Sequence, residues 1–109
     1  MAYDEALAAR IRQALAPRPD IDERKMFGGL AFLLRGNMCC GVVADTLMLR
    51  LGNEGAAEAL KEPHTRPMDF TGKPLKSMVY VGSEGIASPE DLQRWVNRGA
   101  DFAETLPPK

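Results

Sequence analysis

Residues 24 to 34 read RKMFGGLAFLL, an apolar run that two adjacent glycines interrupt. Glycine adopts the positive φ of tight turns at little cost, so Gly28 and Gly29 predict a strand-to-strand turn or bulge rather than a phosphate-binding loop. Residues 30–34 are apolar throughout, which predicts a central strand covered on both sides. The cover is either the rest of this chain or a partner chain.

Two more turn signals follow at hairpin spacing. Gly36-Asn37 is the stronger, because both residues tolerate the positive φ of a two-residue hairpin loop, and Asp45-Thr46 is a weaker version. The apolar runs that these turns separate predict strands within an antiparallel meander over residues 21–51. These runs lie at residues 25–27, 30–34, 38–44 and 47–51. In the last of these runs, leucine at every second position alternates with other residues, which predicts a strand with one buried and one partly wet face.

Helices are expected at both ends of the chain. Residues 3–15 carry an apolar stripe with a spacing of four, and Pro17 ends that helix. Near the C-terminus, Ser88 and Pro89 are typical of an N-cap followed by the first helical position. The helix after them also has one apolar stripe. Its members are Leu92, Trp95, Val96, Gly99, Phe102, Ala103 and Leu106.

The middle of the chain predicts smaller elements. Asn53 is a plausible N-cap for a short helix over residues 54–60, which Pro63 would end. Residues 68–70 form at best an edge strand, because the flanking Pro67 and Pro74 cannot donate to a ladder. A turn at residues 71–74 then leads to a strand over residues 77–81.

Together these elements predict an α+β fold. It has an antiparallel sheet of about five strands, flanked by N-terminal and C-terminal helices and a short middle helix. The length of 109 residues, with 45% hydrophobic and 27% charged residues, is typical of one globular domain, here residues 1–109.

Composition narrows the classes of function. The net charge of −1 supplies no global positive field for nucleic acid. Charges within the first sixteen residues argue against a signal peptide or membrane helix. Cys39 and Cys40 are adjacent, and mid-strand neighbours are expected to point to opposite faces, so neither a disulfide nor a metal site is predicted. We expect a protein of the reducing cytoplasm.

Catalytic and cofactor chemistry find little support in the sequence. His64, the single histidine, lies in a proline-rich loop without a recognisable partner nucleophile, and we interpret it as a solvated loop residue. The two cysteines and the six methionines are better interpreted as core residues than as nucleophiles or metal ligands. We therefore predict neither enzymatic activity nor a cofactor.

A set of basic residues is the remaining candidate site for binding an anion or a partner. Its members are Arg24, Lys25, Arg66, Lys73 and Lys76. The alternative interpretation is a solvated polar edge that discourages pairing between sheets.

The order of several motifs resembles the N-terminal domain of the TfoX/Sxy family over nearly the whole chain. These motifs are Lys25-Met26-Phe27-Gly28-Gly29 with Phe32, Gly36-Asn37-Met38, Arg66-Pro67-Met68-Asp69-Phe70 and Trp95-Val96. The resemblance implies helices packed on one antiparallel sheet, similar to the secretion-chaperone-like group. It also implies a bacterial cytoplasmic protein that acts in competence or transcriptional regulation. The larger regulators carry a second, helical domain that this sequence does not include.

Two hypotheses about function stay open. One is a non-enzymatic interaction or regulatory module that forms a homodimer and binds a protein partner through its sheet face and residues 61–76. The other is a small anion-binding protein or enzyme that uses the basic residues. Nucleic-acid binding by this domain alone is not expected, because Trp95 and Phe102 face inward and leave no stacking platform.

Overall fold

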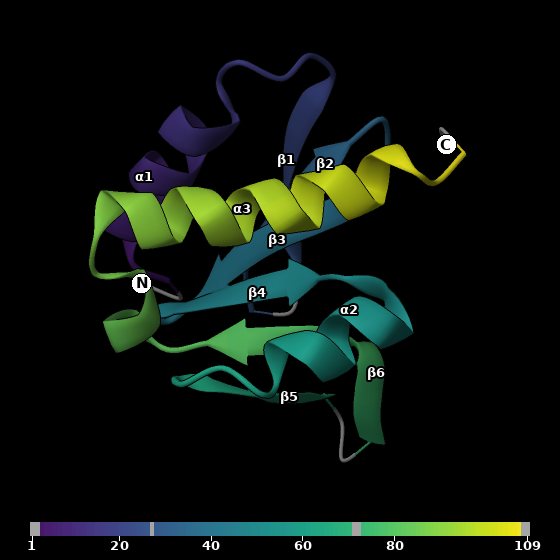
Figure 1. Ribbon diagram of the computed structural model, residues 1–109. Coiled ribbons are helices and arrows are strands. Elements are labelled where there is room, and N and C mark those ends of the chain that lie inside the picture. Colours follow the sequence, from purple (N-terminus) through teal and green to yellow (C-terminus); the bar gives the residue numbers. More distant parts are fainter. Residues whose placement is uncertain (1–2, 27, 71–72, 108–109) are drawn as a thin grey trace.

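The computed structural model describes residues 3–26, 28–70 and 73–107, and the side chains of residues 26, 68–70 and 73–75 lie outside that description. Three helices and a 3₁₀ turn accompany the strands (Figure 1). In chain order the elements are α1 (Glu5–Leu15), β1 (Ile21–Met26), β2 (Gly29–Leu34), β3 (Asn37–Val43), β4 (Thr46–Arg50), α2 (Gly52–Ala59), β5 (Thr65–Phe70), β6 (Lys73–Val81), η1 (Ser83–Ile86) and α3 (Pro89–Glu104).

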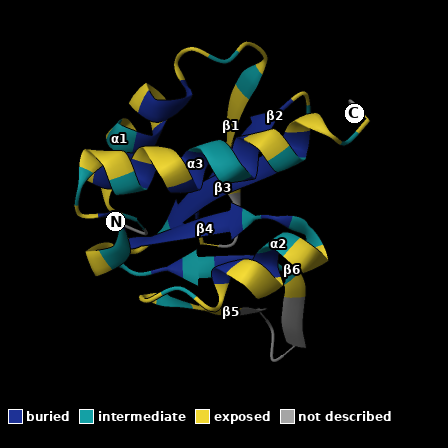
Figure 2. Cartoon of the chain, viewed as in Figure 1, coloured by how far each residue is buried: buried dark blue, intermediate teal, exposed yellow. Residues whose placement is uncertain are grey.

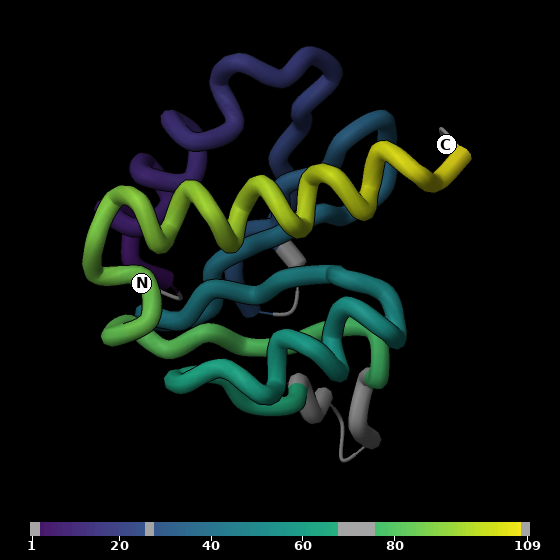
Figure 3. The backbone as a smooth tube through the Cα atoms, in the orientation of Figure 1, coloured from purple at the N-terminus to yellow at the C-terminus, as the bar shows by residue number. Residues whose placement is uncertain are grey.

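The strands form a single six-stranded sheet in the order β1-β2-β3-β4-β6-β5, with every pair antiparallel. The α+β class and the meander are confirmed, and the tube in Figure 3 can be followed through its successive hairpins. The number of strands is one more than expected. β1 extends back through four charged residues, and β5 forms a full strand at the far edge. The expected edge position of residues 68–70 is therefore confirmed.

Two hairpin loops lie one residue earlier than the sequence pattern suggested. Leu34 pairs with Asn37, so the first loop is Arg35-Gly36, with φ values of 53° and 85°. Asn37 instead starts β3, where it is buried and its Nδ2 donates to the carbonyl oxygen of Pro107 at 2.8 Å. Likewise, Val43 pairs with Thr46 and makes Ala44-Asp45 the second loop.

The glycines that interrupt the apolar run do mark a strand-to-strand turn. Met26 pairs with Gly29, and Gly28 has a φ of 75°, while Phe27 lies outside the described residues. A Cβ at Gly29 would lie 2.0 Å from the carbonyl oxygen of Val42. Gly29 is therefore needed for the close approach of two backbones.

The first two helices begin at other residues than expected. Asp4 caps α1 through its Oδ1, which accepts from the N–H groups of Ala6 and Leu7, so the helix does not extend back to Tyr3. α2 begins at Gly52, with Leu51 at the N-cap and no capping side-chain bond. Asn53 therefore lies inside the first turn of α2 and is not its cap.

The expected start of α3 is confirmed. The Oγ of Ser88 accepts from the N–H of Asp91 at 3.1 Å, and Pro89 is the first helical residue. Gly99 faces the sheet so closely that a Cβ there would lie 2.5 Å from the carbonyl oxygen of Cys39. On the polar side of α3, Arg94 forms ion pairs with Glu62 and Asp91.

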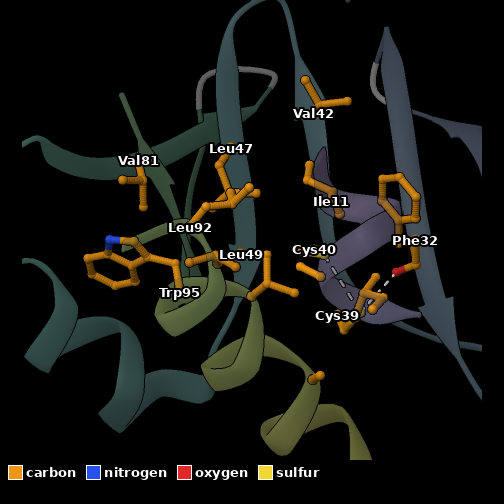
Figure 4. Close-up of a cluster of buried hydrophobic side chains, with 14 of the residues drawn as sticks. Ile11, Phe32, Cys39, Cys40, Val42, Leu47, Leu49, Val81, Leu92 and Trp95 are labelled. Carbon is orange, nitrogen blue, oxygen red and sulfur yellow. Dashed lines mark hydrogen bonds between the residues drawn. The ribbon is translucent and has the colours of Figure 1, made fainter. Parts of the chain in front are cut away.

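The main core lies between the three helices and one face of the sheet, where Trp95, Phe32 and Ile11 are fully buried (Figure 4). A second cluster lies on the opposite face. Its buried members are Ala31, Met38, Met48 and Met78. The prediction of a partly wet face on β4 is therefore wrong at Met48, which is fully buried.

Every residue of β2 is buried within the single chain, as the dark blue strand in Figure 2 shows. The apolar run at residues 30–34 is thus covered by its own chain and leaves no apolar surface for a partner. β6 is longer than the expected strand at residues 77–81, because it begins at Lys73. Thr71 and Gly72 of the expected turn lie outside the described residues.

Candidate functional site

The sheet distributes the candidate basic residues to opposite edges. Arg24 and Lys25 lie exposed on β1, whereas Arg66 lies exposed on β5 and stacks on the ring of Tyr80 at 5.0 Å. Lys76 lies exposed on β6, and Lys73 belongs to the same strand with its side chain outside the description. Four strands separate β1 from β5, so the fold does not bring these residues together along the sheet.

Cys39 and Cys40 point to the same face of β3, contrary to the expected alternation. Phe32 pairs with Cys40 and Leu33 pairs with Met38, which leaves Cys39 as the extra residue of a β-bulge. Both cysteines join the main core, where their sulfur atoms lie 3.8 Å apart (Figure 4). The thiol of Cys39 donates to the carbonyl oxygen of Phe32 at 3.4 Å.

Burial keeps this thiol pair out of reach of a substrate, although the hydrogen bond with Cys40 lowers the pKa of the Cys39 thiol. Both residues are 0% exposed. The hydrogen bond with Cys39, together with burial, raises the pKa of the Cys40 thiol well above its ordinary value. Reactive cysteines need the opposite, a stabilised thiolate that a substrate can reach.

His64 lies exposed in the loop before β5, with a φ of 65°. Its Nδ1 lies 3.7 Å from the Oε2 of Glu84, which is also exposed. Within residues 3–26, 28–70 and 73–107, no three His, Cys, Asp or Glu side chains are grouped as metal ligands would be.

A shallow, open groove of about 690 Å³ runs along the outer face of α3. We call it the α3 groove. It is lined by Pro89, Glu90, Gln93, Arg94, Asn97, Arg98 and Asp101. These positions recur every three or four residues, so they share the face of the helix that lies opposite the core.

Two arginines of the α3 groove are fixed by the loop that precedes β5. The Oε1 of Glu62 accepts from Arg94 at 2.9 Å, and its Oε2 accepts from Arg98 at 2.6 Å. Both guanidinium groups also lie over the ring of Trp95, at 5.0 Å and 4.5 Å from its centroid. Trp95 itself is buried, so its indole forms a rigid floor beneath the two charges.

The electrostatics of this cluster follow from its geometry. Burial would raise the pKa of the Glu62 carboxyl, but the hydrogen bonds from Arg98 and Arg94 outweigh it, and the pKa is lowered overall. Glu62 therefore stays ionised at neutral pH. Arg94 and Arg98 keep unused N–H donors, because each uses Nη1 for Glu62 and a guanidinium has five N–H groups.

The other side of the α3 groove is held by the segment after α1. Arg18 donates to Asp101 at 2.9 Å and also binds Glu104. Gln93 donates to the carbonyl oxygen of Ala14 at 3.1 Å, which connects α1 to α3. Gln93, Arg94, Arg98 and Asp101 of the groove are thus each bonded to another part of the fold.

Sequence reasoning did not identify the α3 groove. It placed Trp95 correctly in the core. The visible signal was two arginines at positions 94 and 98 that flank a buried tryptophan. Glu62 could not be found in this way, because it lies more than thirty residues away along the chain.

Comparison with known proteins agrees with this architecture. The family model of the TfoX N-terminal domain matches residues 13–103, which include the whole sheet, Glu62 and both arginines of the groove. No curated protein matches the chain. None of the helices in the described ranges is long and apolar enough to cross a membrane. The match covers most of the 109 residues, and the chain therefore belongs to the TfoX N-terminal domain family.

Proposed function

We propose that this protein is a non-enzymatic interaction module of the bacterial cytoplasm that acts in regulation by docking a protein partner in the α3 groove. The observation that carries the proposal is the pair Arg94 and Arg98, fixed by Glu62 and stacked on Trp95. The family resemblance implies transcriptional regulation as the setting of that interaction.

The arrangement suits recognition of a protein surface. Arginine is enriched among the residues that contribute most to protein–protein binding. A side chain already held in place loses little conformational entropy when a partner binds, and two ion pairs and an aromatic floor hold these arginines. The groove also presents both signs of charge, because Glu90 and Asp101 lie along the same face, which favours a polar partner surface with complementary charges.

The alternative, an anion-binding protein or enzyme, receives less support from the placement of its residues. Arg24 and Lys25 lie at one edge of the sheet and Arg66 at the other. Arg66 is also engaged with the ring of Tyr80. A bound anion would contact only part of the set.

Photo-crosslinking in the host cell tests the proposal. A crosslinking amino acid replaces Glu90, which is exposed and lines the α3 groove, and a control carries it at Ala57, which is exposed on α2. We expect a covalent adduct with a second polypeptide from position 90 and none from position 57. Mass spectrometry of the adduct identifies the partner.

A pair of variants shows whether the groove itself is responsible. Arg94→Ala should reduce the adduct at position 90 at least several-fold, because it removes one fixed guanidinium. Lys61→Ala removes an exposed charge outside the groove and should leave the adduct unchanged. An adduct that nuclease removes, or none at all under competence-inducing and ordinary growth, would refute docking of a protein here.

A further inference from the structure

β1 has one strand neighbour in the described part of the sheet. It pairs with β2 over all six of its residues, and the sheet order places it at the edge. Four of these residues, from Asp22 to Lys25, are exposed, and Figure 2 shows β1 largely in the colour of exposed residues. An edge strand of this length offers a row of backbone donors and acceptors to another strand.

The register of β1 shows which backbone groups face outward. The N–H of Arg35 donates to the carbonyl oxygen of Asp20 at 3.0 Å, across the pair that continues the β1–β2 ladder. Inward and outward groups alternate along an antiparallel strand. The even-numbered residues of β1 therefore bond to β2, and the outward N–H and C=O groups belong to Ile21, Glu23 and Lys25.

We propose that this free edge pairs with β1 of a second copy of the chain, antiparallel and with the dimer axis at Glu23. In a symmetric antiparallel pair, one residue must lie directly opposite its own copy with the axis midway between them, since opposing side chains share a face. With the axis at Glu23, Ile21 lies opposite the partner's Lys25, and Lys25 opposite the partner's Ile21. All three outward-facing residues then find backbone partners.

The order of charges on β1 fits this register. Asp22, Glu23, Arg24 and Lys25 carry two negative charges followed by two positive ones. Asp22 then faces the partner's Arg24, and symmetry repeats this ion pair on the other side of the axis. Opposite charges directly across two strands stabilise the pair, and like charges destabilise it.

The axis at Glu23 brings two like charges together, and the structure supplies their counter-ions. Arg12 on α1 holds Glu23 with two bonds, from Nε at 2.6 Å and from Nη2 at 2.8 Å. Lys25 of the partner subunit also lies diagonally across from Glu23 on the same face. The neighbouring register, with the axis at Arg24, would oppose two arginines for which the structure gives no such carboxylate partner.

A second copy explains the charged edge better than a foreign strand does. Charges on an edge strand repel most other strands, which is a common protection against unwanted pairing. In the register with the axis at Glu23, the reversed strand places Asp22 opposite Arg24 on both sides of the axis, and the one like-charged pair, at Glu23, is offset by Arg12. The same residues therefore exclude other edges and accept their own copy.

The expected dimer is weak and salt-sensitive. Two paired strands bury less than the area of a typical stable interface, so the dissociation constant should be in the micromolar range or above. The ion pairs between Asp22 and the partner's Arg24 are exposed, so added salt should weaken the dimer further.

Sedimentation velocity from low micromolar to millimolar concentration tests the dimer with charge-reversal variants. Asp22→Arg and Arg24→Asp each replace both ion pairs with repulsive pairs, and each should raise the dissociation constant about tenfold or more. The double variant Asp22→Arg/Arg24→Asp restores opposite charges across the axis. It should recover the wild-type dissociation constant within a few-fold.

Amide hydrogen exchange at two concentrations locates the interface independently. The amides of Ile21, Glu23 and Lys25 should become protected as the dimer forms, whereas those of Asp22 and Arg24 should be protected at both concentrations. A chain that stays monomeric, a dimer that ignores the reversals, or odd-numbered amides that exchange equally fast in the dimer would each overturn the proposal. None of these three outcomes bears on the α3 groove, which the adduct at position 90 tests separately.

Discussion

At the scale of single residues, helix and sheet approach each other closely where α3 crosses the bulge of β3. The extra residue, Cys39, directs its carbonyl oxygen toward the helix, and only a hydrogen atom fits between them at Gly99. A glycine inside a helix costs about 1 kcal/mol relative to alanine. Here the close approach of helix and sheet offsets that cost by bringing Trp95 and Val96 into the core.

Gly99→Ala should therefore destabilise the protein by about 1–2 kcal/mol, although alanine is the better helix former. The new Cβ would lie 2.5 Å from a backbone oxygen that cannot rotate away. Urea unfolding followed by circular dichroism measures the change. Gly82→Ala is the matched control, because its Cβ would have ordinary contacts and the free energy of unfolding should change little. A stabilised Gly99→Ala variant would contradict the close approach.

Glu62 leads to a prediction about pH. Its folded pKa is lowered by Arg98 and Arg94, so its stabilising effect is present above the ordinary glutamate pKa and is lost as pH falls through the folded value. Glu62→Gln should lower the free energy of unfolding at pH 7 by up to about 1 kcal/mol, since solvent screens a side chain that is 33% exposed. The difference should vanish in strong acid.

The control for this pH effect is Glu58→Gln. Glu58 and Lys61 form a pair 3.4 Å apart with both side chains well exposed, and such pairs contribute little. Thermal unfolding between pH 3 and pH 7 compares the three proteins. Equal acid sensitivity of the wild type and Glu62→Gln would show that the carboxylate is not held as described.

At the scale of elements, the sequence predicted correctly those features that depend only on neighbouring residues. Ser88 and Pro89 defined the start of α3 because capping involves only neighbouring residues. The turn at Gly36 was misplaced by one residue because a distant group, the carbonyl oxygen of Pro107, binds Asn37 and draws it into β3. Asn53 was misassigned for a different, local reason. Gly52, with a φ of 77°, already begins α2, two residues before the expected start at residue 54.

Ser88→Ala tests the cap of α3. The loss of the bond that its Oγ accepts from the N–H of Asp91 should destabilise the protein by about 1 kcal/mol and increase exchange of the amides in the first turn. Ser83→Ala, an exposed position in η1 that caps no helix, should change stability by less than about 0.5 kcal/mol. Chemical denaturation with hydrogen exchange measures both. Equal effects of the two substitutions would argue against the cap.

At the scale of the whole molecule, the central part of the sheet carries buried side chains on both faces. One face packs against the three helices, and the other holds a cluster rich in methionine. The sequence predicted the α+β class and the meander because hydrophobic periodicity and turns are local. It did not predict the second cluster at Met48, because alternation along one strand does not reveal what covers its far face. The α3 groove was hidden for the same reason, since Glu62 reaches it only through the fold.

Met48→Ala should destabilise the protein by about 2–5 kcal/mol, as expected for a fully buried methionine. Leu60→Ala, at the exposed end of α2, should cost less than about 0.5 kcal/mol. The fluorescence of Trp95, which lies in the other cluster, should report the same transition for Met48→Ala as circular dichroism does. Separate transitions would mean that the two faces of the sheet unfold independently.

The bulge on β3 places two thiols in the core, and their reactivity reports opening of the fold. Because both sulfur atoms lie side by side in the interior, a thiol-alkylating reagent reaches them only when the packed layers separate. Under native conditions the rate of labelling therefore reports opening of the packed core, and it equals the opening rate when labelling is faster than reclosing. The two sites should react together, so that doubly labelled chains accumulate with scarcely any singly labelled ones.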